Sequence, residues 1–167
     1  MDRYDAIVIG AGQSGPPLAA RLAQGGMRVA VIERGKFGGT CVNNGCTPTK
    51  AMVASAYVAR LARAAGAYGV DIAGSVKVDM ARVKARKDGV VAKSSQGVEK
   101  WMRGLKDAAV FLGLGRFVGE RRVEVNGEVL EGERIFIDVG GRPLVPKMPG
   151  IESVPYLTNE TVMELDE

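Results

Sequence analysis

The chain has 167 residues, 46% of them hydrophobic, and carries 23 Lys and Arg against 19 Asp and Glu. This length allows one domain with a sizeable core, or one domain with part of another. No window approaches the roughly 20 apolar residues of a membrane span, and no signal-peptide core precedes the first strand. We therefore expect a cytoplasmic protein without a membrane partner. The absence of histidine excludes a Ser-His or Cys-His triad and a histidine metal site within the chain.

The first part of the chain has the pattern of a strand-helix-strand unit. Residues 4–9 form a short apolar run typical of a buried strand, residues 15–25 have apolar side chains at helical spacing, and residues 29–33 form a second buried strand. This order favours parallel strand pairing with a right-handed crossover.

The turn between the first strand and the helix is rich in glycine. In the sequence Gly-Ala-Gly-Gln-Ser-Gly, Gly10 permits the tight turn, Gly12 allows a pyrophosphate to approach, and Gly15 lets the helix pack closely on the strand. The free N–H groups of the helix N-terminus would then face the phosphates. Glu33, at the end of the second strand, would accept hydrogen bonds from a ribose. The alternative is a purely structural turn with Glu33 in solvent.

The two cysteines lie in a second glycine-rich segment, residues 38–50. In a regular helix, Cys41 and Cys46 would be too far apart for a disulfide, so the backbone between them must be distorted. Asn43-Asn44-Gly45 suits such a bend, and Thr47 as N-cap with Pro48 at the first helical position would start the next helix.

This placement predicts redox chemistry. The helix dipole favours a thiolate at Cys46, and Lys50 on the same helix face adds positive charge. A reducible short-loop disulfide suits a two-electron relay, whereas two thiols alone cannot close a zinc site, so we expect no metal. The alternative is a pair of ordinary buried thiols.

Two longer helices are predicted next. The first covers residues 47–65, with one face formed by Val53, Tyr57, Leu61 and Ala64. The second covers roughly residues 79–106, and Gly89 and Gly97 weaken its continuity. Its inward side chains are expected to be Val83, Val90, Val98, Trp101 and Leu105. The basic stretch 82–87 could suggest nucleic acid, but without interleaved aromatic residues it indicates a solvated helix face and no nucleic-acid partner.

After residue 108 the pattern changes to short strands, expected to form an antiparallel insert. They cover residues 110–112, 116–118, 122–125, 128–130 and 135–139, and Asn126-Gly127 predicts a tight hairpin. A second glycine-rich sequence at residues 113–119 is no dinucleotide fingerprint, because no helix follows it. Prolines gather at residues 143–156, as in a linker.

Together, these motifs resemble the class I pyridine nucleotide-disulfide oxidoreductases, the group of dihydrolipoamide dehydrogenase, glutathione reductase and mercuric reductase. The match is most specific at residues 38–50, Gly-Gly-Thr-Cys-Val-Asn-Asn-Gly-Cys-Thr-Pro-Thr-Lys. The residues of this segment are more similar to those of mercuric reductase-like members than to those of glutathione reductase. Residues 135–143 resemble the family's second flavin-contacting strand. There Val139 replaces the family's usual threonine, which removes a hydroxyl.

The resemblance implies an α/β, Rossmann-like FAD-binding domain with a parallel sheet, long helices and an antiparallel β-meander insert. FAD would lie with its pyrophosphate at the glycine turn, its adenosine near Glu33, and its isoalloxazine beside Cys46 and Lys50. Cys46 would be the flavin-facing thiolate and Cys41 the sulfur that exchanges with substrate. The residues that would bind FAD are Gly10, Gly12, Ser14, Gly15, Glu33, Arg34, Gly39, Thr40, Gly115, Arg116, Val139, Gly140 and Arg142.

In the complete enzyme of this family, NAD(P)H passes hydride to flavin, flavin reduces the Cys41–Cys46 disulfide, and the dithiol reduces a disulfide or a mercuric ion. The resemblance also implies a homodimer. We expect residues 1–150 to be an incomplete FAD-binding domain and 151–167 to be a linker toward an absent NAD(P)-binding domain, so that this fragment alone is inactive. The alternatives are a non-catalytic flavin- or thiol-binding module and a fragment of a flavin monooxygenase or amine oxidase, which would not require the cysteine pair.

Overall fold

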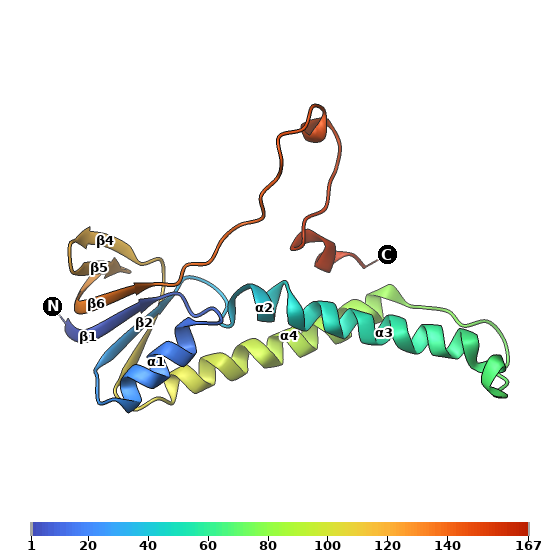
Figure 1. Ribbon diagram of the computed structural model, residues 1–167, viewed down its shortest axis with the longest axis horizontal. Coiled ribbons are helices and arrows are strands. Elements are labelled where there is room, and N and C mark those ends of the chain that lie inside the picture. Colours follow the sequence, from blue (N-terminus) through green and yellow to red (C-terminus); the bar gives the residue numbers. More distant parts are fainter. Residues whose placement is uncertain (1, 167) are drawn as a thin grey trace. The chain divides into compact units, whose positions relative to one another are not determined.

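The computed structural model describes residues 2–166 and shows the expected α/β class (Figure 1). The strands are β1 Asp2–Ile9, β2 Val29–Glu33, β3 Ala108–Leu112, β4 Arg116–Gly119, β5 Arg122–Val125 and β6 Glu128–Ile137. The α-helices are α1 Gly15–Gln24, α2 Gly39–Asn43, α3 Cys46–Ala64 and α4 Met80–Arg103. Short 3-10 helices follow at η1 Ala65–Tyr68, η2 Ile151–Ser153 and η3 Thr161–Glu164. Within residues 2–166, no helix is both long and apolar enough to cross a bilayer.

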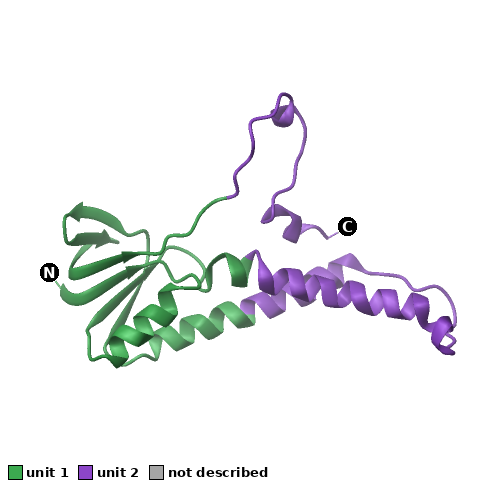
Figure 2. Cartoon of the chain, in the orientation of Figure 1, with its two compact units in different colours: residues 1–43, 93–142 green, residues 44–92, 143–167 purple. Residues whose placement is uncertain are grey.

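The chain divides into two compact units (Figure 2). The first, unit 1, runs to Asn43 and resumes over residues 93–142, so it contains the whole sheet. The second, unit 2, comprises residues 44–92 and the chain from Pro143 onward. The border between Asn43 and Asn44 falls inside the cysteine segment, so Cys41 belongs to unit 1 and Cys46 to unit 2.

The sheet of unit 1 has six strands in the order β3-β2-β1-β6-β5-β4. Neighbouring strands from β3 to β6 pair in parallel, and β6, β5 and β4 pair antiparallel. The expectation that residues 110–112 belong to the antiparallel insert is therefore wrong: β3 continues the parallel sheet beside β2, with Val29 opposite Ala108 and Glu33 opposite Leu112. Its apolar run matches a parallel strand better than an insert.

The two strands expected at residues 128–130 and 135–139 are one strand, β6. The polar sequence between them resembles a turn, but Gly132 has a packing role: a Cβ there would lie 2.8 Å from Cγ1 of Ile7 on the neighbouring β1. The first part of β6 pairs with β5, and the strand pairs with β1 from Leu130 to Ile137. This strand therefore joins the parallel and antiparallel parts of the sheet.

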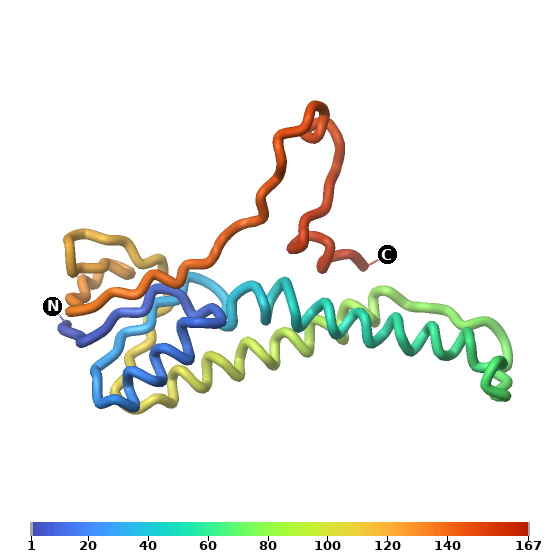
Figure 3. Tube along the Cα trace, viewed as in Figure 1, coloured from blue at the N-terminus to red at the C-terminus, as the bar shows by residue number. Residues whose placement is uncertain are grey.

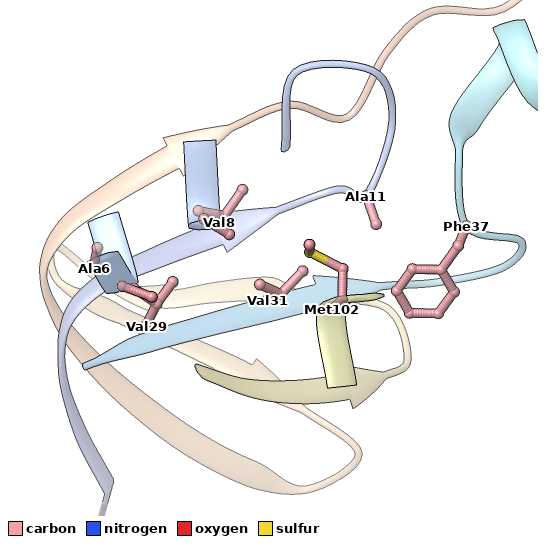
Figure 4. Packing of buried hydrophobic residues seen from close by; sticks show 9 residues of the cluster. Ala6, Val8, Ala11, Val29, Val31, Phe37 and Met102 are labelled. Carbon is pink, nitrogen blue, oxygen red and sulfur yellow. The ribbon is translucent and has the colours of Figure 1, made fainter. Parts of the chain in front are cut away.

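Alternate side chains of β1 and β2 enter two cores. Ala6, Val8, Val29 and Val31 pack with α1 and with Met102 of α4, and Phe37 and Ala11 close the same cluster (Figure 4). On the opposite face, the buried side chains are Tyr4, Ile7, Ile9, Ala30, Ile32, Val123, Val125 and Leu130. Burial on both faces explains the continuous apolar runs of these strands. Beyond β5, Asn126 and Gly127 adopt positive φ angles of 53° and 83°, which confirms the tight hairpin.

The chain runs through α3 and η1 into α4 (Figure 3). Helix α4 is continuous through Gly89 and Gly97, at which an added Cβ would meet nothing within 4 Å. The predicted apolar face of α3 is largely exposed: Val53, Tyr57 and Leu61 are 60%, 57% and 44% accessible. Likewise, Val90 and Trp101 of α4 are exposed rather than inward. Helical spacing alone did not show whether a neighbouring element covers these faces.

Candidate functional site

The glycine turn of unit 1 joins β1 to α1 and brings backbone segments into close contact. Gly10 has a φ of 112°, and a Cβ there would collide with the backbone oxygen of Asp138. A Cβ on Gly15 would collide with the backbone oxygen of Gly10. The structure thus supports the packing roles expected for these two glycines.

Gly12 faces another glycine across the turn. Gly39, with a φ of 58°, lies so close that a Cβ on it would be 2.7 Å from the Cα of Gly12. The N–H of Gly38 donates to the carbonyl of Ala11 over 2.7 Å, which ties the two segments together. The two backbones pack directly on each other, whereas a Cβ on Gly12 would meet nothing closer than 3.7 Å, so a phosphate could approach the backbone of Gly12.

Glu33 is oriented by two backbone donors. Its Oε2 accepts a hydrogen bond of 2.8 Å from the N–H of Ala11, and its Oε1 accepts one of 2.8 Å from the N–H of Gly35. The carboxylate therefore lies beside the glycine turn, in a fixed orientation at the end of β2, whereas Arg34 is exposed to solvent. The alternative of an unattached, solvated Glu33 does not fit this geometry.

The start of α1 differs from the expectation of several free N–H groups. The helix begins at Gly15, and Pro16 and Pro17 occupy the next two positions. Proline has no N–H, so the first turn offers fewer donors to a phosphate than a usual helix N-terminus does. The open backbone at Gly12 is therefore the stronger feature of this site.

Asp138, which follows the last residue of β6, was missed by the sequence reasoning. Its N–H donates to the carbonyl of Ile9 over 2.8 Å, and its Oδ1 accepts a hydrogen bond of 2.6 Å from the hydroxyl of Ser14. Its Oδ2 is buried and has no hydrogen-bond partner among residues 2–166. That oxygen is 3.7 Å from the position of a Cβ on Gly12 and 3.1 Å from one on Gly15. It lies within residues 135–143, which resemble a flavin-contacting strand, but that resemblance did not single out its side chain.

The other predicted cofactor-binding residues of unit 1 are spread over its loops. Val139 is 60% exposed, and Gly140 has a φ of 67° just after β6. Thr40, Arg116 and Arg142 are exposed. Gly115 has a packing role, because a Cβ there would lie 3.3 Å from side-chain atoms of Ile32 and Val123.

The two cysteines are thiols in the structure, not a disulfide. Cys41 is half-buried within α2, and Cys46 is exposed as the first residue of α3. The helical backbone is interrupted at Asn44-Gly45, which confirms the predicted distortion between the cysteines. In unit 1, the side-chain amide of Asn43 donates to the carbonyls of Phe37 and Gly39 over 3.0 and 2.9 Å and so holds the loop before α2.

The start of α3 lies two residues earlier than predicted. Gly45, with φ −123° and ψ −110°, is the N-cap, and the N–H of Thr49 donates to the Gly45 carbonyl over 3.1 Å. Thr47 is therefore not the N-cap, and Pro48 occupies the third helical position, where its missing N–H still costs no hydrogen bond. Cys46 does lie in the first helical turn, as predicted, and Lys50 is exposed on the next turn.

Unit 2 contains a separate charge cluster on α4 and η3. Lys87 is 2% exposed, and its Nζ donates to the carbonyl of Met163 and contacts Oδ1 of Asp88, both over 2.6 Å. Lys84 contacts Oδ2 of Asp88 at 2.9 Å and Oε2 of Glu164 at 3.2 Å. Hydrogen bonds from Lys87 and Lys84 lower the pKa of Asp88 below its usual value. The basic stretch 82–87 is thus not wholly a solvated face.

No group of three metal-binding side chains occurs in the described part of the chain.

Comparison with known proteins identifies the family. Residues 4–166 match the model of the family described as pyridine nucleotide-disulphide oxidoreductase. The chain belongs to this family. It is 33% identical to mercuric reductase of Staphylococcus aureus over 166 residues, which are 98% of this chain and 30% of that protein. It is 38% identical to dihydrolipoyl dehydrogenase of Thermus scotoductus over 144 residues, which are 86% of this chain and 31% of that protein.

A solved structure supports the assignment of this chain to the pyridine nucleotide-disulphide oxidoreductase family. The HOCl-induced flavoprotein disulfide reductase RclA from Escherichia coli superposes with a TM-score of 0.78 at 32% identity, over 98% of this chain and 34% of RclA. The Rossmann-like α/β fold expected from the sequence is thereby confirmed. The chain spans about a third of the length of each of these three proteins.

Proposed function

We propose that this chain is the FAD-binding, redox-disulfide part of an NAD(P)H-dependent flavoprotein reductase of disulfides or mercuric ion. The observation that carries the proposal is the cysteine segment, in which Cys41 and Cys46 flank a helix interruption in a chain of this family. Residues 1–150 would form the FAD-binding domain and 151–167 the linker to an NAD(P)-binding domain. FAD, when bound, would supply a two-electron relay between the nicotinamide and the thiols.

Unit 1 fits such a cofactor at two places. Gly12 has no side chain, and a Cβ there would meet nothing closer than 3.7 Å, which suits the close approach of a pyrophosphate to its backbone. Glu33 is held beside the same turn and retains lone pairs for ribose hydroxyls. Ser14, Arg34, Thr40, Gly115, Arg116, Gly140 and Arg142 are further proposed contacts, and Val139 can contribute only its backbone to any hydrogen bond.

The cysteines would act by thiol-disulfide exchange. The Cys41 thiolate attacks one sulfur of an acceptor disulfide, forms a mixed disulfide and releases the first thiol. The Cys46 thiolate then attacks the Cys41 sulfur, which releases the second thiol and leaves the Cys41–Cys46 disulfide. The N-terminal position of Cys46 in α3 favours its thiolate, and Lys50 adds positive charge nearby.

We further propose that the complete enzyme is a cytoplasmic homodimer. A reduced nicotinamide donor belongs to the interior of the cell, and the resemblance to class I pyridine nucleotide-disulfide oxidoreductases implies a homodimer. Its acceptor is a small molecule, either a disulfide or mercuric ion, as the name of one relative suggests. A chain that binds FAD without turnover is the second candidate, favoured by Gly12 and Glu33, which could hold the cofactor without any part being played by the cysteines.

The test is to purify the chain, add FAD and record flavin absorbance after gel filtration, then after reduction by dithiothreitol. Bound flavin and a long-wavelength thiolate-flavin band are expected; Cys46→Ser should abolish the band and Cys41→Ser should retain it. An unchanged spectrum in Cys46→Ser would contradict the assigned role. Steady NADPH oxidation by the 167-residue chain with a disulfide acceptor would contradict the second candidate, a chain that binds FAD without turnover.

A further inference from the structure

Two buried side-chain oxygens have no hydrogen-bond partner among residues 2–166, Oδ1 of Asn43 and Oδ2 of Asp138, and the second lies beside Gly12 and Gly15 of the glycine turn. Oδ1 of Asp138 is used by Ser14, but its Oδ2 is buried without a hydrogen-bond partner among residues 2–166. Leaving a buried acceptor unpaired costs free energy, so such a group in a native structure calls for an explanation, one of which is a partner supplied by a ligand. The turn that this oxygen faces is also the proposed pyrophosphate site.

The chemistry of a carboxylate restricts what that partner can be. An ionised carboxylate only accepts hydrogen bonds, and a diphosphate also only accepts, so the phosphates themselves cannot satisfy Oδ2. The ligand must therefore carry a hydroxyl or amine donor next to its phosphates. The adenosine ribose is proposed to lie at Glu33, whose two oxygens are held by Ala11 and Gly35. The ribityl chain on the other side of the pyrophosphate carries several hydroxyls.

We propose that Asp138 binds a hydroxyl of the ribityl chain of FAD and thereby positions the flavin half of the cofactor. Ser14 orients the carboxylate by donating to Oδ1, and Oδ2 is left to accept from the ligand. The close packing of Gly10 against the Asp138 backbone fixes the residue relative to the turn. This inference rests on the proposed FAD binding and adds a positioning residue to it.

The test compares two ligands that share adenosine and pyrophosphate but differ in the ribityl chain. Affinities for FAD and ADP are measured by calorimetry for the unaltered chain, Asp138→Ala, Asp138→Asn and the exposed control Asp71→Ala. Asp138→Ala should weaken FAD binding by about tenfold to a hundredfold, the usual effect of losing a hydrogen bond to a charged group, and should change ADP binding less than about threefold. Asp138→Asn, whose NH2 group can donate to the Ser14 hydroxyl while its oxygen accepts from the ligand, should recover part of the loss. Asp71→Ala should change neither affinity.

A flavin analogue sharpens the result. For an FAD analogue that lacks the contacted ribityl hydroxyl, Asp138→Ala should cause no further loss of affinity. Equal losses for FAD and ADP would overturn the inference and assign Asp138 to the shape of the turn. Tighter binding of both ligands by Asp138→Ala would overturn it in favour of charge repulsion of the phosphates.

If the unaltered chain binds ADP but not FAD, the proposed function itself fails. If the unaltered chain binds FAD and Asp138→Ala binds FAD equally well, only this inference fails.

Discussion

Lys87 in unit 2 is a buried ionisable residue, and Asp138 in unit 1 is a half-buried one with a single buried oxygen, yet their surroundings are opposite. Lys87 donates to the Met163 carbonyl and contacts Asp88, with Glu164 at 3.9 Å. Asp138 uses one oxygen for Ser14 and leaves the other unpaired. Removing a buried charge that is fully paired leaves its partners without hydrogen bonds and so destabilises the fold, whereas a half-paired carboxylate still has an oxygen that a ligand can use. The same kind of group thus serves structure in one unit and, by our proposal, binding in the other.

The largest expected effect comes from removing the paired charge. Lys87→Ala should lower the free energy of unfolding by about 2 kcal/mol, because the Met163 carbonyl and Asp88 both lose their buried donor. Urea denaturation with fluorescence detection measures the change.

Two variants control for other causes. Lys87→Met retains most of the buried stem, so its remaining loss reports the lost hydrogen bonds. Lys93→Ala, on the exposed side of the same helix, should change stability by less than about 0.5 kcal/mol. If Lys87→Ala lowered the free energy of unfolding no more than Lys93→Ala does, the contrast drawn between Lys87 and Asp138 would be wrong.

A smaller effect of opposite sign is expected at the unpaired charge. In the ligand-free chain, Asp138→Asn should raise the free energy of unfolding by about 1 kcal/mol, because a neutral amide is less costly to bury than a half-paired carboxylate. The same denaturation experiment, without FAD, measures it. If Asp138→Asn instead lowered the free energy of unfolding as much as Lys87→Ala does, Asp138 would be needed for the fold rather than for a ligand.

The smallest effect concerns pH and Asp88. Hydrogen bonds from Lys87 and Lys84 lower the pKa of Asp88, and hydrogen bonds to Asp88 and Glu164 raise the pKa of Lys84. A carboxyl with a lowered pKa contributes stability above its unfolded pKa of about 3.9 and loses that contribution as the pH falls through the folded pKa. The unaltered chain should therefore be more stable than Asp88→Asn at pH 7 and pH 5.

That advantage should shrink between about pH 4 and the folded pKa of Asp88. Glu164 also faces the lysines, but it is present in both proteins, so its titration largely cancels in the difference. Urea midpoints of both proteins across this range measure the effect. A difference that stayed constant down to pH 2 would mean that Asp88 does not depend on the charge cluster.

The regular part of unit 1 could be predicted from the sequence. The apolar runs of β1 and β2 and the glycine turn identified the strand-turn-helix order almost to the residue, because each element is encoded by neighbours in the chain. The interruption between Cys41 and Cys46 was predictable for the same reason, since Asn44-Gly45 has a local preference for unusual backbone angles.

The contrast between the two buried charges could not be predicted, because it depends on contacts between distant segments. Lys87 lies in a basic stretch that looks uniformly solvated, and its partner Met163 is 76 residues away. Asp138 and Ser14 are separated by 124 residues. The break expected in β6 failed similarly: Gly132 resembles a turn residue until Ile7 on a neighbouring strand is seen to occupy the space of its missing side chain.

The pairing of β1 with β6 also bears on how the chain is made. Asp2 pairs with Leu130 and Ile9 with Ile137, so the centre of the sheet joins segments 128 residues apart. At translation rates of about 5–20 residues per second, β6 leaves the ribosome roughly 6–26 s after β1. During that interval β1 can pair with β2 but keeps one edge of an apolar strand unpaired. The nascent chain therefore has a period of several seconds in which a chaperone, or another nascent strand, can compete with β6 for that edge.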